Sequence, residues 1–253
     1  MKLSIIVPCY NEADNLPRLL TAFQQTIGGR TDYELVLVNN GSRDRSAEVF
    51  RELLPRFPFA RVTNVEVNQG YGFGILSGLR SAKGEYLAWT HADLQTDPAD
   101  VVLGYDLLRK QACPERAFVR GVRRGRPLVD RVFTAGMSVV ASAALGRRLY
   151  DINAQPKIFH RALLPHLDRA PWDFSLDLFV LHLAGRLGLD VLELPVDFGR
   201  RTHGEAKGGG SLRGKYKLTM RTLTYIFALR KKLREEAAAI VSSTAPVESR
   251  RAA

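Results

Sequence analysis

The chain has 253 residues, of which 45% are hydrophobic and 25% charged, the balance of an ordinary globular protein. This composition excludes a wholly disordered chain, a collagen and a coiled coil. Cys9 and Cys113 have neither the number nor the spacing of a disulfide framework or a zinc site, and a chain of this length can bury a sizeable core without either. We therefore expect a reducing, cytoplasmic compartment.

The net charge of +11 lies almost entirely in one stretch of the sequence. Residues 200–234 contain eleven Lys and Arg and a single acidic residue, Glu205, so this stretch carries a charge of +10. Such a field suits an anionic membrane face, phosphorylated substrates or nucleic acid. No helix-turn-helix, zinc-finger or aromatic RNA-binding pattern accompanies the charge, so no nucleic-acid partner is expected.

The first part of the chain alternates strand and helix patterns. Apolar runs predict strands at 3–7, 34–38, 62–67 and 86–90, and helical spacing predicts helices at 15–26, 46–54 and 72–81. Consecutive strand–helix–strand units make right-handed parallel crossovers. The expected fold is therefore α/β, an open and mostly parallel Rossmann-like sheet with helices on both faces, which binds ligands at the carboxyl ends of its strands.

The pattern changes after about residue 115. A basic segment at 116–131 precedes a helix of small residues at 132–145, and a helix at 176–187 leads to a strand at 191–198. A glycine-rich loop at 204–214 follows, and then a basic amphipathic helix whose apolar stripe is Tyr216, Met220, Leu223 and Phe227. No run reaches the ~20 apolar residues that span a bilayer, and the apolar start is too short for a signal peptide.

Polar residues follow the predicted strands. Asp93 comes just after strand 86–90, where a carboxylate suits a hard divalent cation, and Gln95 can point the same way. The competing interpretation is that Asp93 caps the next turn. Asn11, Glu12 and Asn40 stand at the ends of the first two strands, where they suit a base or a ribose, although capping and turn formation also explain them.

Two further groups suit phosphate. Gly70, Gly72 and Gly74 lead into the third predicted helix, where backbone N–H groups can approach a phosphate, or where glycine simply permits a turn and close packing. Arg123 lies in a cluster of arginines whose planar forks fit phosphate oxygens, unless the segment is a solvated basic loop.

These motifs together resemble family 2 glycosyltransferases of the GT-A fold, most closely the polyprenyl-phosphate branch typified by dolichol-phosphate mannose synthases. The resemblance runs from Leu3 to about Tyr216, and it depends on the shared order and spacing of the motifs. They are Val-Pro-Cys-Tyr-Asn-Glu at 7–12, Asn-Asn-Gly-Ser-Arg-Asp at 39–44, Gly-Tyr-Gly at 70–72, His-Ala-Asp-Leu-Gln-Thr-Asp-Pro at 91–98, Gly-Val-Arg at 121–123, and Leu-Pro-Val through Gly-Glu-Ala-Lys at 194–207.

Two positions depart from the family pattern. The family usually has Asp-Asp-Gly-Ser where this chain has Asn-Asn-Gly-Ser, so an amide at Asn40 replaces the carboxylate that contacts the nucleotide base. An amide both donates and accepts hydrogen bonds, which changes what the base meets. His91 replaces the first Asp of the metal motif and leaves Asp93 as the retained primary ligand.

The resemblance implies a metal-dependent, inverting hexosyltransferase. It would move a sugar from a GDP- or UDP-sugar to a polyprenyl phosphate at the cytoplasmic membrane face. Mg²⁺ or Mn²⁺ would be bound by Asp93, with Gln95 or His91 assisting. The resemblance also implies that Arg123 acts in catalysis and that Asp177 stands where hydroxyl-accepting relatives have their base, unless Asp177 only caps or decorates its helix. The implied donor-site residues are Pro8, Tyr10, Glu12, Asn40, Gly70, Asp93, Gln95, Arg201 and Lys207.

The expected organisation is a catalytic domain at 1–214, with a nucleotide-sugar half at 1–115 and an acceptor half at 116–214. An amphipathic membrane-proximal helix at 215–236 and a disordered tail at 237–253 would follow. We expect a cytoplasmic protein held peripherally on an anionic membrane surface by the helix, unless the helix packs its stripe on the α/β domain. Two alternative functions are a family 2 enzyme with a hydroxyl acceptor, on a glycan or a small molecule, and a non-catalytic relative that binds sugar nucleotides.

Overall fold

The computed structural model describes residues 3–125, 128–199, 216 and 219–231. Its first half confirms the predicted alternation of strands and helices. The observed elements are β1 (Leu3–Cys9), α1 (Leu16–Ile27), β2 (Tyr33–Asn40), α2 (Ser46–Leu53), β3 (Ala60–Val65), α3 (Tyr71–Ser81) and β4 (Tyr86–Trp89). The predicted bounds differ from these by a few residues at most, because the apolar runs end at Asn, Gly and Pro turn signals.

The second half contains three elements that the sequence analysis did not predict: α4 (Pro98–Arg109), β5 (Ala117–Arg124) and β6 (Lys157–His160). The remaining elements are α5 (Leu128–Leu145), α6 (Leu176–Arg186) and β7 (Asp190–Asp197), with 3₁₀ turns at Leu54–Arg56, Pro114–Arg116 and Arg161–Leu167. Most of the basic segment at 116–131 is therefore regular structure rather than a loop, since it holds β5 and the start of α5.

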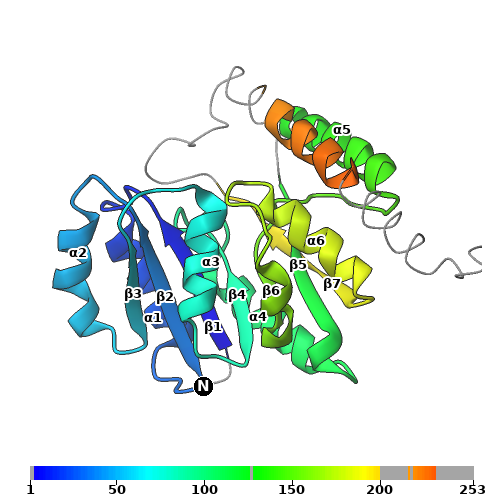
Figure 1. The fold of residues 1–253 in the computed structure, drawn as a ribbon. Helices are drawn as coiled ribbons and strands as arrows, with labels where there is room; N and C mark the ends of the chain where they lie inside the picture. Colours follow the sequence, from blue (N-terminus) through cyan, green and yellow to red (C-terminus); the bar gives the residue numbers. More distant parts are fainter. Residues whose placement is uncertain (1–2, 126–127, 200–215, 217–218, 232–253) are drawn as a thin grey trace, which may run out of the picture.

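The seven strands form one sheet in the order β3-β2-β1-β4-β6-β5-β7. Only β6 runs antiparallel to its neighbours β4 and β5, so the other six strands point the same way and end at one edge (Figure 1). The sheet is continuous across residue 115, where the two halves of the predicted domain meet. The shared carboxyl edge is where a sheet of this type opens a ligand crevice.

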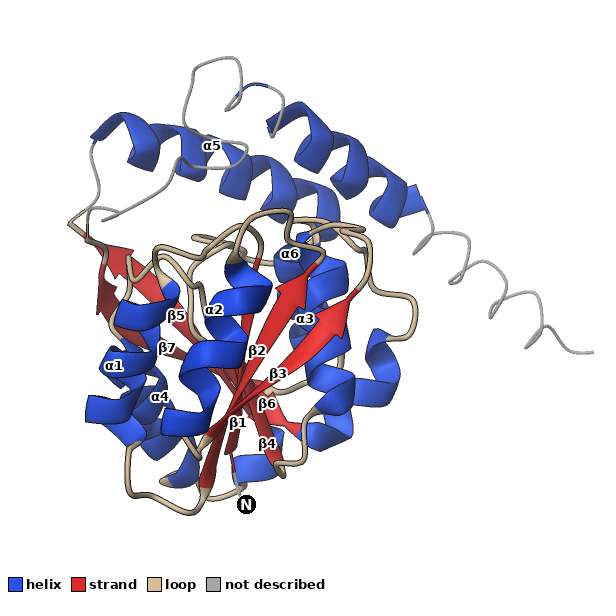
Figure 2. Cartoon of the chain, turned by 90° about the vertical axis from the view of Figure 1, so that its left-hand side faces the viewer, coloured by secondary structure: helices blue, strands red, loops and turns tan. Residues whose placement is uncertain are grey.

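Helices cover both faces of the sheet (Figure 2). Buried side chains of α1, α2 and α4 pack on one face, and those of α3 and α6 pack on the other. These two hydrophobic clusters have fully buried strand residues at their centres, including Ile5 on one face and Ile6 on the other. The predicted α/β architecture with helices on both faces is therefore confirmed.

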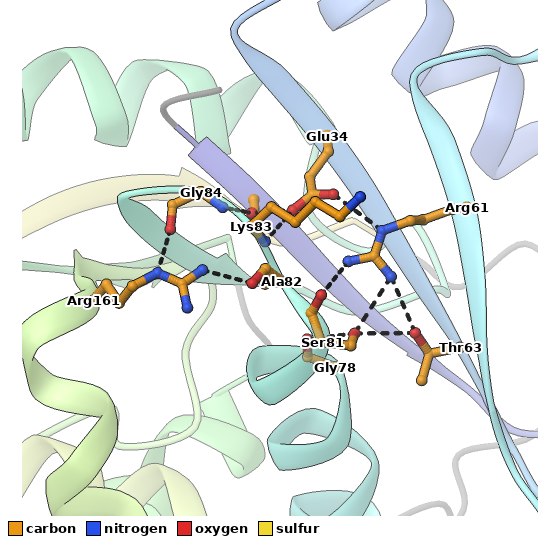
Figure 3. Close-up of polar contacts among 10 residues, drawn as sticks. Glu34, Arg61, Thr63, Gly78, Ser81, Ala82, Lys83, Gly84 and Arg161 are labelled. Carbon is orange, nitrogen blue, oxygen red and sulfur yellow. Dashed lines mark hydrogen bonds and ion pairs between the residues drawn. The ribbon is translucent and has the colours of Figure 1, made fainter.

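A polar network fixes the opposite, amino-terminal edge of the sheet (Figure 3). The buried Glu34 carboxylate accepts from Ser4 Oγ, from the backbone N–H of Lys83 at 2.6 Å and from Arg61 Nε at 3.0 Å. Burial raises the pKa of Glu34, but these donors together hold it below its ordinary value. Arg161 donates to the carbonyl of Gly84. The network anchors the turn that leads into β4.

Two helices lie beyond the carboxyl edge of the sheet, α5 and the helix at residues 219–231 (Figures 1 and 2). They share one hydrophobic cluster with α6, which contains the buried Ala141 of α5 and Ile226 of the 219–231 helix. Of the predicted helix at 215–236, residues 215, 217–218 and 232–236 lie outside the described residues, as do the glycine-rich loop and the predicted tail. Within the described residues, no helix has the length and apolar character needed to cross a bilayer.

Candidate active site

Asp93 is the acidic group at the carboxyl edge of the sheet on which the candidate site depends. It lies just beyond the end of β4, is 6% exposed, and accepts a hydrogen bond from the backbone N–H of Gln95 at 3.1 Å. Gln95 in turn is tied to the end of β7, because its side chain donates to the carbonyl of Gly199 at 3.2 Å and its own carbonyl accepts from the Gly199 N–H at 2.8 Å. The loop carrying Asp93 is thus anchored at two places, by β4, which it follows, and by the segment just after β7.

His91 precedes Asp93 in the same loop and takes part in an aromatic stack. Its ring lies against Tyr71, with centroids 5.7 Å apart, and Tyr71 stacks on Phe174 at 4.7 Å. Burial lowers the pKa of His91 below its ordinary value, although the carboxylates of Asp93 and Asp177 act in the opposite direction. The lowered pKa favours the neutral imidazole, which is the form that binds metals.

These donors suit a divalent cation that takes most of its ligands from a substrate. Among the described residues, no group of three or more His, Cys, Asp and Glu side chains is arranged to hold a metal ion. Asp93 offers a hard oxygen donor and His91 a neutral nitrogen donor. Mg²⁺ and Mn²⁺ are commonly bound through one or two protein groups, with diphosphate oxygens and water completing the shell. The residues present therefore fit such an ion.

Asn40 ends β2 at the carboxyl edge and has a buried acceptor that no described residue uses. Its side-chain amide donates to the carbonyl of Gly70 at 3.0 Å, whereas its buried Oδ1 has no hydrogen-bond partner among the residues described. A buried amide oxygen without a partner costs free energy unless a ligand supplies a donor. Asn40 thus offers an acceptor where the family's carboxylate offers one.

The glycines before α3 allow backbone to approach backbone. Gly70 has φ of +122°, and a Cβ there would lie 2.3 Å from the carbonyl oxygen of Trp172. A Cβ at Gly72 would lie 2.5 Å from the carbonyl oxygen of Pro171, and Phe73 N–H already donates to Trp172 at 3.0 Å. Close packing of the 171–173 loop on the start of α3 accounts for both glycines.

The loops after β1 and β2 hold each other in place. The backbone N–H groups of Asn11 and Glu12 donate to Ser42 Oγ and Ser46 Oγ, each at 3.1 Å. The Glu12 carboxylate accepts from the side chain of Asn15 at 2.6 Å. Pro8 lies in β1 and Tyr10 just after it, so the predicted donor residues of this motif all stand at the carboxyl edge.

Arg123, near the end of β5, is paired with an acidic residue. Its Nε donates to Asp151 Oδ1 at 2.9 Å and its backbone N–H to Oδ2 at 2.7 Å, and the guanidinium contacts the same carboxylate again. Both side chains are 11% exposed. Much of the Arg123 fork is therefore already occupied. The other two predicted phosphate ligands, Arg201 and Lys207, lie outside the described residues.

Asp177 is buried rather than open to the crevice. It lies in the first turn of α6, is 1% exposed, and pairs with Lys157 Nζ at 2.7 Å. Sequence reasoning missed Lys157 and the nearby Gln155, and it included Tyr71 only as part of the Gly-Tyr-Gly motif at 70–72. No local signal marks the contacts of these residues with Asp177, because Asp177 is distant from them along the chain.

The sequence of this chain is similar to those of curated glycosyltransferases. A curated undecaprenyl-phosphate 4-deoxy-4-formamido-L-arabinose transferase of Edwardsiella ictaluri (strain 93-146) is 30% identical over 223 residues, which cover 82% of this chain and 63% of that protein. A dolichol-phosphate mannosyltransferase of Pyrococcus furiosus is 27% identical, over 85% of this chain and 60% of that protein. The chain thus spans about 60% of the length of these relatives.

Solved structures and a family profile agree with the fold. A crystal structure of glucosyl-3-phosphoglycerate synthase from Mycobacterium tuberculosis, in complex with Mn²⁺, UDP and glucosyl-3-phosphoglycerate, superposes with a TM-score of 0.66 at 17% identity, covering 90% of this chain and 79% of that one. The profile of glycosyl transferase family 2 matches residues 4–164, which is more than half of the chain. This chain therefore belongs to glycosyl transferase family 2.

Proposed function

We propose that this protein is an inverting, metal-dependent glycosyltransferase that moves a sugar from a GDP- or UDP-sugar to a polyprenyl phosphate. The observation that carries the proposal is the buried Asp93, in the same loop as His91, at the carboxyl edge of a family 2 sheet. The names of the relatives support the acceptor, because they include transferases acting on undecaprenyl phosphate and dolichol phosphate.

In this proposal, residues at the ends of the strands bind the metal ion and the donor. Asp93, with His91 or Gln95, would hold Mg²⁺ or Mn²⁺, and such an ion would neutralise charge on the donor diphosphate. Asn40 offers its unpaired oxygen to an N–H of the base. Pro8, Tyr10, Glu12 and Gly70 line the donor side, whereas Arg201 and Lys207 would bind phosphate oxygens.

The reaction then needs few further groups. An acceptor oxygen attacks the anomeric carbon from the face opposite the diphosphate, a bond forms between that oxygen and the carbon, and the bond to the diphosphate oxygen breaks with its electron pair. A phosphate oxygen is already ionised, so no proton has to be removed. Arg123 would guide the acceptor phosphate by exchanging its Asp151 contact for phosphate oxygens.

We further propose that the 219–231 helix holds the protein peripherally on an anionic membrane surface on the cytoplasmic side. Its buried face carries Ile226 and Leu229, and its outer face leaves Met220 44% and Phe227 54% exposed. Lys231 lies on the same exposed side. Apolar side chains flanked by basic ones suit the headgroup region of a membrane. This arrangement would bring the crevice close to a lipid-linked phosphate.

A donor screen by thermal shift tests the assignment of the site. With Mn²⁺ present, a GDP- or UDP-sugar at 100 times its Kd should stabilise the fold by about 2.7 kcal/mol. Asp93→Asn should abolish this shift, whereas Asp168→Asn, which changes an exposed carboxylate far from the crevice, should keep it. A shift that survives in Asp93→Asn, or in EDTA, would refute the metal-site assignment.

A further inference from the structure

A buried ion pair lies behind the aromatic stack of the crevice. Lys157 has a fully buried side chain, yet its ammonium group has a partner for each of its three protons. It donates to the carbonyls of Ile152 at 2.9 Å and Ala154 at 3.0 Å, and it lies 2.7 Å from Asp177 Oδ1. The charges are therefore balanced inside the protein, out of contact with solvent.

The same carboxylate supports the wall of the crevice. Asp177 Oδ1 also accepts from Gln155 Nε2 at 2.9 Å, and Gln155 Nε2 lies 3.2 Å from the hydroxyl oxygen of Tyr71. The ring of Tyr71 is in turn held between Phe174 and His91. A continuous set of contacts therefore runs from Lys157 through Asp177 and Gln155 to the stack beside Asp93.

We infer that Asp177 is a positioning residue, held by Lys157 so that it orients Gln155 and Tyr71, and that it does not take a proton from the acceptor. This inference rests on the proposed function and adds a residue role to it. Asp177 Oδ1 already contacts Lys157 and Gln155, so the acceptor that suits the site is one whose attacking oxygen is already ionised, as in the proposed polyprenyl phosphate.

Burial supports this role physically. Burial lowers the pKa of Lys157, and the charge of Asp177 opposes that effect, so the ammonium depends on its carboxylate partner to stay charged. A buried charge that loses its partner is strongly destabilising, whereas removing both charges together is tolerated far better. A double-mutant cycle of stability therefore measures whether Asp177 and Lys157 support each other in the fold.

The cycle uses Asp177→Asn, Lys157→Met and the two combined. Each single variant should melt ~10 °C below the wild type, because it leaves one buried charge without a partner, and the double variant should recover at least half of that loss. The exposed pair of Arg45 and Glu48, replaced by Met and Gln, is the matched control and should shift the melting temperature by no more than about 1 °C. Additive losses in the double variant would overturn the inference.

Transfer assays with the same variants test the catalytic part. The combined Lys157→Met and Asp177→Asn variant should transfer sugar to polyprenyl phosphate within about tenfold of the wild type, with an unchanged pH profile between about pH 6 and 9. Loss of a general base would instead cost about 10²–10⁴-fold, and such a loss in a variant that melts near the wild type would overturn the inference.

A third substitution tests positioning directly. Asp177→Ala in the Lys157→Met background removes the oxygen that accepts the hydrogen bond from Gln155. Its rate of transfer should be at least about fivefold below that of Asp177→Asn in the same background, mainly through a higher KM for the acceptor. Equal KM values for the Ala and Asn variants would contradict a positioning role.

The melting cycle needs no acceptor. If the wild type transfers sugar to no lipid phosphate at all, the proposed function fails while the cycle still decides whether the pair is structural.

Discussion

At the scale of single residues, the sequence pointed to members of the candidate site but not to their partners. Asp93 and Asn40 were singled out by their positions after strands and His91 by the family resemblance, and all three lie at the carboxyl edge of the sheet. The pairing of Arg123 with Asp151 and of Asp177 with Lys157 was not predictable. Each pair joins positions at least 20 residues apart that no local spacing rule connects.

Asp100, in the first turn of α4, should make stability depend on pH. Burial, with a smaller contribution from the Asp97 carboxylate, raises the pKa of Asp100 from 3.8 to about 6. The folded state thus holds its proton more tightly than the unfolded state, so the stabilisation is complete below about pH 4 and is lost as the pH rises through about 6. The free energy of unfolding of Asp100→Asn should therefore be ~1 kcal/mol higher than that of the wild type at pH 8, and the difference should disappear at pH 4.

Urea unfolding of both proteins at the two pH values measures this difference. The comparison is between variant and wild type at each pH, so that titration of other carboxylates cancels. A stability difference that is the same at pH 4 and pH 8 would show that Asp100 has an ordinary pKa in the folded protein.

At the scale of elements, sequence patterns failed where strands are short or carry charge. In β5, Arg120 interrupts the apolar run, yet it is 3% exposed because its guanidinium lies over the Tyr150 ring and pairs with Glu193. The four-residue β6 contains the fully buried Lys157. Only tertiary partners make such charged residues compatible with a central strand. For α4, the Asp97 cap before Pro98 was a usable local signal that the sequence analysis did not read.

Two glycine substitutions should act in opposite directions. Gly72→Ala places a methyl group within 3.0 Å of carbonyl groups in the 171–173 loop and should destabilise the fold by ~1–3 kcal/mol. Gly136→Ala, in the exposed middle of α5 with nothing within 4 Å, should stabilise it by ~0.5–1 kcal/mol. Urea midpoints measure both effects. A neutral Gly72→Ala would mean that the loop does not pack on α3 as described.

Substitutions at two neighbouring residues of the 219–231 helix should distinguish its role in packing from its role in membrane attachment. Ile226 is fully buried, so Ile226→Ala should cost ~2–5 kcal/mol of stability without weakening vesicle binding by the folded protein. Phe227 is 54% exposed, so Phe227→Ala should leave stability within ~0.5 kcal/mol and reduce co-sedimentation with anionic vesicles. Binding should also weaken as salt rises. Equal binding to neutral and anionic vesicles would remove the basis for electrostatic attachment.

At the scale of the whole molecule, the sheet explains why distant motifs converge. Six strands run in parallel and end at one edge, so motifs dispersed between residue 8 and residue 199 meet along that edge of the sheet. The overall α/β plan was predictable because strand and helix periodicities are local properties of the sequence. The insertion of antiparallel β6 between β4 and β5 was not, because its four residues carry no recognisable alternation.

The measurement that tests the central claim most directly compares two lipids that differ only in the attacking group. Vesicles containing undecaprenyl phosphate or undecaprenol are incubated with labelled GDP- and UDP-sugars and Mn²⁺, and lipid-linked label is counted. We predict labelled lipid from the phosphate alone, with one of the donors, and its loss in Asp93→Asn. Label on the alcohol at a comparable rate, or undiminished transfer by Asp93→Asn, would contradict the account.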